Sequence, residues 1–313
     1  MKRFDIALFG SVFVDHVLTG LTRLPGPGEE VFAESYQREV GGGCFNTACG
    51  MALLGSSPTC FALVGREDSQ WMLDRVRSFG VATDQVRFSD LPTGVTVSAS
   101  LSASESAERA FFTYDGANQA LIDCLESPEL PERLAVARHV HFACPISPTK
   151  GLQIVRKLHQ LGSTASLDVG WHEAWLRNPA SWHLLAELDW FLPNESEARL
   201  MTGQSDMENV LRVFAARGAR RVVVKRGPHG ATLWNGVEAL RAPGVAVRVV
   251  DTTGAGDAFN AGFLHAFLAG LSETICLNRG TICGSLSTRQ AGSLAAFPNL
   301  NEVLEYHDNI TKR

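Results

Sequence analysis

The stretch DTTGAGDAFN, residues 251–260, places two glycines and a carboxylate directly before an apolar run. Phe259, Phe263 and Phe267 recur at every fourth position, which predicts a buried helix that follows the glycines. Glycines let backbone N–H groups approach a ligand, and the free N–H groups of a helix start favour an anion. Asp257 would lie beside that anion, where a carboxylate can accept a hydroxyl proton as a phosphoryl group is attacked.

A second interpretation of the same residues is purely structural. Aspartate is common in the first turn of a helix because it interacts favourably with the helix dipole. Glycine-rich turns between a strand and a helix also occur in many α/β proteins. The spacing alone therefore leaves both roles of Asp257 open, the catalytic base and the helix-stabilising charge.

Upstream of this stretch, from about residue 139, short apolar runs alternate with helix-patterned runs, which predicts a mainly parallel sheet covered by helices. The strand-like runs are HVHFA, TASLDV, DWFLP and RRVVVK, and the helix-like runs are 148–161, 172–187, 194–202 and 206–217. In the last of these, the apolar residues recur at helical spacing and should lie on the sheet: Met207, Val210, Leu211 and Phe214.

Two segments, 29–40 and 93–114, break the alternation. The second has a period-two pattern around a turn rich in Ser, Ala and Glu, which predicts a hairpin. We expect approximately 12–40 and 93–115 to form a small β lid outside the main sheet. Since no linker separates independent domains, residues 1–313 are predicted to form a single α/β domain.

The composition is that of a globular protein, with 313 residues, 45% apolar content and a net charge of −5. Basic and acidic residues are mixed, which argues against a nucleic-acid partner. The seven cysteines lack C-x-x-C spacing and fit a reducing, cytoplasmic setting. Asp5 interrupts the N-terminal apolar run and Asp15 ends it, so it is shorter than the ~18 residues of a membrane span and predicts a strand.

The stretch DTTGAGDAF resembles the C-terminal signature of the ribokinase-like, or phosphofructokinase-B, family of carbohydrate kinases. The resemblance implies a three-layer sandwich with a mainly parallel central sheet and a small β lid, and it implies ATP and Mg²⁺ as cofactors. It makes Asp257 the catalytic base. The amides of Gly254, Ala255 and Gly256 would stabilise charge on the transferring phosphate.

Further motifs extend the resemblance to the sugar side. GSVFVD, ending at Asp15, resembles the first-strand motif whose Asp holds sugar hydroxyls, although a polar strand terminator is the alternative. GGGCFNTA resembles an element in which Gly42 and Gly43 let the sugar approach and Asn46 bonds to it, although a triple glycine alone indicates only a tight turn. GAN, ending at Asn118, gives a further substrate residue or a helix N-cap.

On the nucleotide side, PNESE resembles the family motif for magnesium and phosphate, with Asn194 near the nucleotide and Glu197 holding Mg²⁺ through water. The same two residues also fit a helix capping box. VVVKRGPHGATLW resembles the turn beside the ATP phosphates, with Gly227 and Gly230, and places Lys225 where many members carry Thr.

Two regions carry less information. In LDVGWHEAW, Asp168 and Trp175 match the family but Gly170 and His172 do not, so sugar identity cannot be taken from this region. STRQAG, residues 287–292, resembles the loop that with Asp251 binds a monovalent cation such as K⁺ in several members. The adenine pocket is expected around residues 278–292.

The combined interpretation is an ATP-dependent kinase that transfers the γ-phosphoryl group to a hydroxyl, a primary one, of a small sugar or sugar acid. The alternative is a nucleoside kinase of the same family, in which Phe111, Phe112 and Tyr114 stack on the base; a non-catalytic sensor is a third hypothesis. A dinucleotide-dependent oxidoreductase is excluded because no Gly-x-Gly-x-x-Gly follows the first strand. We also expect the lid to pair in a homodimer.

Overall fold

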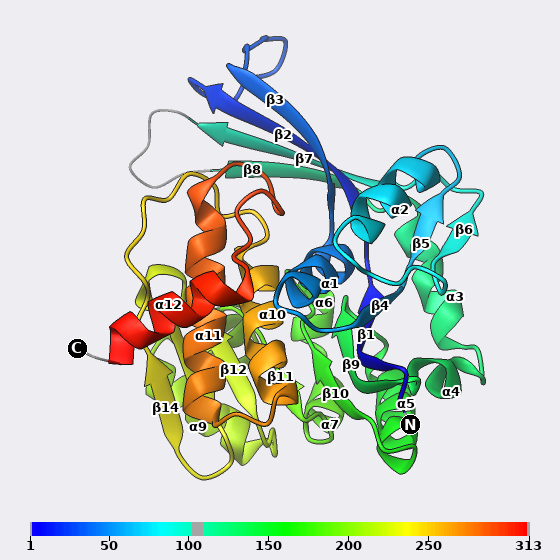
Figure 1. The fold of residues 1–313 in the computed structure, drawn as a ribbon, viewed down its shortest axis with the longest axis vertical. Helices are drawn as coiled ribbons and strands as arrows, with labels where there is room; N and C mark the ends of the chain where they lie inside the picture. Colours follow the sequence, from blue (N-terminus) through cyan, green and yellow to red (C-terminus); the bar gives the residue numbers. More distant parts are fainter. Residues whose placement is uncertain (1, 102–108, 312–313) are drawn as a thin grey trace.

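Eight strands form the central sheet of the computed structural model, which describes residues 2–101 and 109–311 (Figure 1). Neighbouring strands pair in parallel from β4 to β12, whereas β13 is antiparallel to both β12 and β14. In sheet order the strands are β14 (Ala239–Ala242), β13 (Ala231–Trp234), β12 (Val222–Lys225), β11 (Trp190–Phe191), β10 (Thr164–Leu167), β9 (Ala137–Ala143), β1 (Phe4–Gly10) and β4 (Pro58–Phe61).

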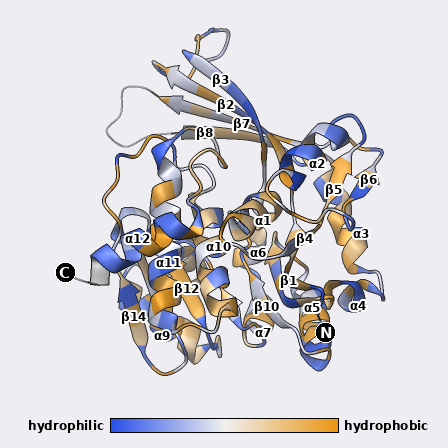
Figure 2. Cartoon of the chain, viewed as in Figure 1, coloured by the Kyte–Doolittle hydropathy of each residue, from blue (hydrophilic) through white to orange (hydrophobic). Residues whose placement is uncertain are grey.

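Helices cover both faces of this sheet. Along β1, Ile6 and Leu8 pack into the apolar cluster of one face, while Ala7 and Phe9 pack into that of the other. Strands buried on both faces read as continuous apolar runs, as β12 does (Figure 2). The first face carries α1 (Gly43–Leu53), α2 (Ser69–Arg77), α10 (Ala255–Leu268), α11 (Glu273–Leu286) and α12 (Leu300–Thr311).

The second face carries the remaining α-helices of the described residues: α3 (Leu121–Leu125), α4 (Leu130–Leu134), α5 (Pro148–Gln160), α6 (Glu173–Leu176), α7 (Ser181–Leu185), α8 (Glu195–Thr202) and α9 (Met207–Ala216). Short 3₁₀ turns are η1 (Gly116–Ala120), η2 (Gly227–His229) and η3 (Ser287–Arg289). The predicted three-layer α/β class with a mainly parallel sheet is therefore confirmed. The apolar residues predicted for α9 are buried against the sheet, as expected.

One predicted element differs. The run 172–187 forms two short helices, α6 and α7, rather than one. Pro179 lies between them; proline has no N–H to donate, and it disfavours helical geometry at Asn178. The side chain of Asn178 instead accepts a hydrogen bond from the N–H of Ala180, which turns the chain into α7.

A second sheet of four strands projects from the central one (Figure 1). Its order is β3 (Ser35–Gly41), β2 (Phe13–Leu21), β7 (Gly94–Leu101) and β8 (Arg109–Tyr114). The inner pair β2–β7 is parallel and the outer pairs are antiparallel. The turn expected between β7 and β8 lies outside the described residues. A small third sheet pairs β5 (Leu63–Gly65) with β6 (Arg87–Ser89).

Within residues 2–101 and 109–311, none of the helices has the length and apolar character needed to cross a lipid bilayer.

Candidate active site

A cleft of about 950 Å³ opens between the second sheet and the loops that follow the strands of the central sheet. This is the edge at which open α/β sheets bind ligands, because the carboxyl ends of parallel strands meet there. Of the residues predicted from sequence, those that line the cleft are Gly43, Asn118, Asn194, Glu197, Lys225, Gly256 and Asp257. The others lie behind or beside it: Asp15, Gly42, Asn46, Gly227, Gly230, Asp251, Gly254 and Ala255.

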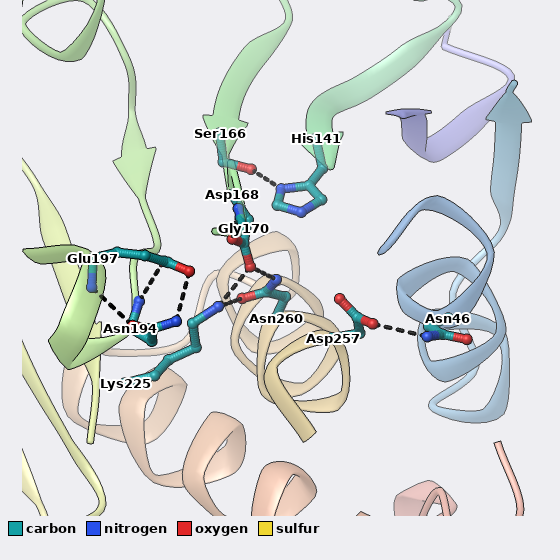
Figure 3. A network of polar contacts seen from close by, with 10 residues as sticks. All are labelled: Asn46, His141, Ser166, Asp168, Gly170, Asn194, Glu197, Lys225, Asp257 and Asn260. Atoms are coloured by element: carbon teal, nitrogen blue, oxygen red, sulfur yellow. Dashed lines mark hydrogen bonds and ion pairs between the residues drawn. The ribbon is translucent and has the colours of Figure 1, made fainter. Parts of the chain in front are cut away.

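Asp257 lies in the first turn of α10 and faces α1 (Figure 3). The amide nitrogen Nδ2 of Asn46 donates to Oδ2 of Asp257 at 2.8 Å, which fixes the carboxylate. Burial raises the pKa of Asp257 to about 6; the Asn46 hydrogen bond opposes this rise and the charge of Asp168 adds to it. A carboxylate with a pKa near the working pH is well suited to act as a general base.

A glycine turn leads into the start of α10. Gly254 adopts a left-handed conformation with φ of 74°, and a Cβ added there would lie 2.9 Å from the side chain of Ser293. The N–H of Ala255 donates to the carbonyl of Thr252 at 3.2 Å. A Cβ at Gly256 would lie 3.4 Å from Nζ of Lys225, so this ammonium lies beside the helix start, where it adds to the field of the helix.

Lys225 is held by two residues from other elements (Figure 3). Its Nζ lies 2.5 Å from Oδ2 of Asp168, and Nδ2 of Asn260 donates to the same oxygen at 2.6 Å. Burial acts to raise the pKa of Asp168, but the charge and hydrogen bond of Lys225, together with the hydrogen bond from Asn260, hold the pKa below its usual value. Burial likewise acts to lower the pKa of Lys225, and Asp168 and Glu197 together raise it instead. The pair is therefore fully charged at neutral pH.

Asn194 and Glu197 form the predicted capping box of α8. Oδ1 of Asn194 accepts from the Glu197 N–H at 2.9 Å, and Oε2 of Glu197 accepts from the Asn194 N–H at 2.8 Å. The side chain of Asn194 also donates to Oε1 of Glu197 at 2.6 Å. Burial, followed by the charge of Asp168, raises the pKa of Glu197 to about 7.

These contacts make Glu197 a fixed carboxylate at the edge of the cleft. Among residues 2–101 and 109–311 no three His, Cys, Asp or Glu side chains converge on one point where they could hold a metal. Mg²⁺ keeps most of its waters in proteins and needs one or two carboxylates. Glu197 fits such an ion bound mainly through water.

On β2, Asp15 is 6% exposed, and burial followed by the charge of Asp257 raises its pKa to about 7. Its strand position is paired with that of Thr96, which lines the cleft. Oδ1 of Asn46 is buried without a hydrogen-bond partner in the described structure, which is unusual for a polar atom and suits a ligand. Asn118 lines the cleft, but both ends of its amide bond to the backbone of Val12.

Asp251 ties the glycine turn to the loop before α12. Its Oδ1 accepts from the N–H of Thr253 and its Oδ2 from the N–H of Gly292, each at 2.8 Å. Gly227 and Gly230 form the turn after β12 with positive φ values of 54° and 77°. The assignment of Asp251 to a monovalent cation and that of Gly227 and Gly230 to ATP remain predictions.

Asn260 is the site residue that the sequence analysis missed, and Asp168 was noted there only as a match to the family. Asn260 lies one turn after Asp257 on α10 and is fully buried. The available signal in the sequence was an amide side chain within an apolar, helix-patterned run, because a buried amide needs a hydrogen-bond partner.

Similar proteins identify the family to which the chain belongs. Residues 3–300 match the pfkB family of carbohydrate kinases. The chain is 26% identical over 318 residues to an ATP-dependent 6-phosphofructokinase of Thermoanaerobacterium thermosaccharolyticum, covering 98% of this chain and 95% of the relative. It is 27% identical over 289 residues to a 2-dehydro-3-deoxygluconokinase of Bacillus subtilis, covering 87% of each.

Among solved structures, ribokinase of Arabidopsis thaliana complexed with ribose and ATP superposes with a TM-score of 0.81 and 27% identity, over 96% of this chain and 98% of the other. The match spans the central sheet, its helices and the second sheet, since nearly all of both chains is covered. The chain therefore belongs to the pfkB family of carbohydrate kinases, which are phosphotransferases with an alcohol group as acceptor.

Proposed function

We propose that the protein transfers the γ-phosphoryl group of ATP to a primary hydroxyl of a small sugar or sugar acid. One observation carries the proposal: the carboxylate of Asp257 lines the cleft in the first turn of α10, and the ammonium of Lys225 lies beside the same helix start. A base and an oxyanion site side by side are what phosphoryl transfer to a hydroxyl requires.

In this mechanism Asp257 accepts the proton of the attacking hydroxyl. Asn46 keeps the carboxylate oriented, and its unpartnered Oδ1 is available to the acceptor. The backbone of Gly254 to Gly256 and the ammonium of Lys225 stabilise the negative charge on the transferring phosphate. Mg²⁺, held near Glu197 through water, would neutralise charge on the ATP oxygens.

Supporting roles are proposed for the residues around this centre. Asp15, Gly42, Gly43 and Asn118 hold or make room for the acceptor, and Asn194, Gly227 and Gly230 serve the nucleotide. The second sheet acts as a lid, because Thr96 and Thr113 on its strands line the cleft and closure would exclude water.

Two further proposals concern the surroundings. Asp251 and the carbonyl groups of loop 287–292 bind a monovalent cation, since this carboxylate already organises the loop next to the glycine turn. The second sheet forms a homodimer contact, because Phe32 and Phe111 are 78% and 55% exposed on or beside its strands.

A nucleoside kinase is the second candidate function. It is favoured by apolar side chains, including Ile122 and Trp171, that line the cleft and have more than half of their surface exposed. A free sugar offers such side chains little apolar surface to cover.

The test is an ADP-release assay with Mg-ATP against pentoses, hexoses, sugar acids and nucleosides, with and without K⁺. Asp257→Asn serves as the control variant. Acceptor-dependent ADP release that disappears in the variant supports the proposal. Absence of acceptor-dependent release across the panel, or full activity of the variant, contradicts it.

A further inference from the structure

Two histidines of β9 lie fully buried between the central sheet and α10. His139 and His141 are each 0% exposed, and the ring of His139 lies against that of Phe267 with 5.6 Å between the ring centroids. Side chains alternate along a strand, so His141 faces the same side of the sheet as His139. The proposed reaction uses neither residue, and a buried polar ring needs hydrogen-bond partners.

A row of hydrogen bonds joins the two rings to β10. Nδ1 of His139 lies 2.7 Å from Oγ1 of Thr164, and Nε2 lies 2.7 Å from Oγ of Ser166. The same Ser166 oxygen lies 2.7 Å from Nδ1 of His141 (Figure 3). These four residues form the histidine network, which leads from the partly exposed Thr164 toward the carboxyl ends of β9 and β10.

Asp168 is the next polar residue along this row. It follows Ser166 by two positions and therefore faces the same side of the sheet, toward α10, where Asn260 bonds to it. The N–H of Asp168 donates to the carbonyl of Phe142 at 2.9 Å, which continues the parallel pairing of β10 with β9. The histidine network thus ends next to the carboxylate that holds Lys225.

The hydrogen bonds also determine which ring nitrogens carry protons. Both rings are neutral at pH 7, because burial lowers the pKa of His141 to about 4 and that of His139 well below its usual value. A neutral imidazole has one donor nitrogen and one acceptor nitrogen. The Thr164 hydroxyl donates to the carbonyl of Arg138 at 3.5 Å, so it accepts from Nδ1 of His139. The Ser166 hydroxyl then donates to His139 and accepts from Nδ1 of His141; the reverse direction would lose the bond to Arg138.

Nε2 of His141 is therefore an acceptor, and it is buried without a hydrogen-bond partner among the described residues. Such an atom is unusual in a folded protein, because leaving it unpaired costs free energy. The amide nitrogen of Asn260 has two N–H groups, of which one is bonded to Asp168. A water molecule that donates to His141 and Asp168 and accepts from Asn260 would have the partners that buried water typically has.

Building on the proposed kinase function, we infer that the histidine network positions Asp168 and, through it, the ammonium of Lys225. One buried water molecule bonds to Nε2 of His141 and links the network to the carboxylate of Asp168 and the amide of Asn260. Asp168 in turn holds Lys225 beside the start of α10, where the phosphates of ATP are proposed to bind. His139 and His141 are positioning residues, since they contact neither ATP nor the acceptor in this arrangement.

Stability alone does not explain a polar network at this place. Hydrogen bonds in a core replace bonds to water, so exchanging buried polar partners for apolar groups of the same shape can be nearly neutral or even stabilising. The inference therefore predicts a separation of two properties. Variants of the network should lose affinity for ATP while they keep most of their stability.

The first measurement reads the two rings directly. In the full chain with isotope-labelled histidine, NMR correlations between ring nitrogens and ring protons distinguish protonated from unprotonated nitrogens, and His141→Phe identifies the signals of His141. We expect both rings to be neutral at pH 7 with the proton on Nδ1. A crystal structure should show a water molecule within hydrogen-bond distance of Nε2 of His141. A proton on that nitrogen, or no water beside it, overturns the inference.

The second measurement is the affinity for Mg-ATP, by calorimetry without an acceptor. His141→Phe keeps a planar ring but removes its nitrogens, and we expect Kd to rise about fivefold, the factor that one lost hydrogen bond provides. His141→Gln keeps an acceptor at the end of the side chain and should recover most of this affinity. The matched control is His265→Phe, because His265 also has a buried ring nitrogen without a partner in the described structure but lies in the last turn of α10. Its Kd should change less than about twofold.

A merely structural role predicts a different result. His141→Phe would then lower the melting temperature and weaken ATP and acceptor binding alike, and His141→Gln would not recover either. That result overturns the inference, as does an unchanged Kd for Mg-ATP in a folded His141→Phe. If His141→Phe does not fold, Ser166→Ala, which removes the shared hydroxyl, is measured with the same expectation.

Failure of the kinase proposal is distinguishable from failure of this inference. If no acceptor gives ADP release, the kinase proposal fails, and the protonation of the ring nitrogens, the bound water and the Kd for Mg-ATP still decide the role of the network. If ADP release depends on an acceptor but the network variants bind Mg-ATP as the unchanged protein does, the kinase proposal stands and the inference is overturned.

Discussion

Removing one partner of the Lys225–Asp168 ion pair should destabilise the fold far more than removing a surface charge. The two side chains are 11% and 13% exposed, and their charged atoms lie 2.5 Å apart. Lys225→Met keeps the length of the side chain but leaves Asp168 buried beside Glu197 without a cation. Loss of one partner of a buried pair costs about 3–5 kcal/mol, because the remaining charge is uncompensated.

The double variant makes this reasoning quantitative. Asp168→Asn removes the opposite charge, so Lys225→Met combined with Asp168→Asn leaves no unpaired ion. We expect the double variant to lose at least about 2 kcal/mol less stability than the sum of the single variants. The deficit of Lys225→Met should also shrink as the pH falls, because without the ammonium the pKa of Asp168 rises and protonation removes its charge.

The assay is urea unfolding of the four proteins at pH 7 and pH 5, followed by circular dichroism and tryptophan fluorescence, whose transitions must coincide. Lys157→Met is the control, since its pair with Glu132 has side chains 45% and 51% exposed and should contribute under about 1 kcal/mol. Additive single effects, within about 0.5 kcal/mol, would refute the reasoning. So would a loss in Lys225→Met no larger than in the control.

Three further predictions concern the reaction. Asp257→Asn should lower kcat by about 10²–10⁴ with an unchanged or higher melting temperature, and a large loss of folding instead would argue for a structural role. Because the pKa of Asp257 is about 6, kcat should fall on the acid side of that pH. Asn46→Ala removes a hydrogen bond that lowers this pKa, so the acid limb of the pH profile of the variant should move to higher pH. An unmoved limb would contradict the assignment of the limb to Asp257. Glu197→Gln should raise the Mg²⁺ concentration for half-maximal rate about tenfold, as loss of a group that orients metal-bound water does, whereas an unchanged Mg²⁺ titration would separate Glu197 from the metal.

The elements that the sequence predicted well are those whose signal is local. The stripe of Phe259 and Phe263 identified α10, and the spacing of Asn194 and Glu197 identified the start of α8, because both patterns lie within one or two helical turns. The prediction of a single helix over 172–187 was wrong, because apolar periodicity does not reveal the break that Pro179 imposes.

The site was predicted less completely for the same physical reason. Asp257 and Asn260 belong to one contiguous stretch, whereas Lys225 of β12 and Asp168 of the loop after β10 meet Asn260 only in the folded chain. No spacing pattern in the sequence shows that these side chains come into contact. The sequence therefore placed Lys225 near the nucleotide without its two fixed partners.

The path of the chain through the second sheet limits how this protein can be recombined with its relatives. β2 pairs in parallel with β7, and all of α1 through β6 lies between them in the chain. The second sheet is therefore made from two separate segments of the chain, and a chimera must exchange residues 13–41 and 94–114 together. At the junctions Gly42 and Gly94 leave no room for a side chain, with a Cβ 2.5 Å from the Ser11 carbonyl and from the Asn118 amide, respectively. Crossover points should accordingly keep each glycine and the segment beside it from the same parent, so the second sheet cannot be transplanted as one continuous segment.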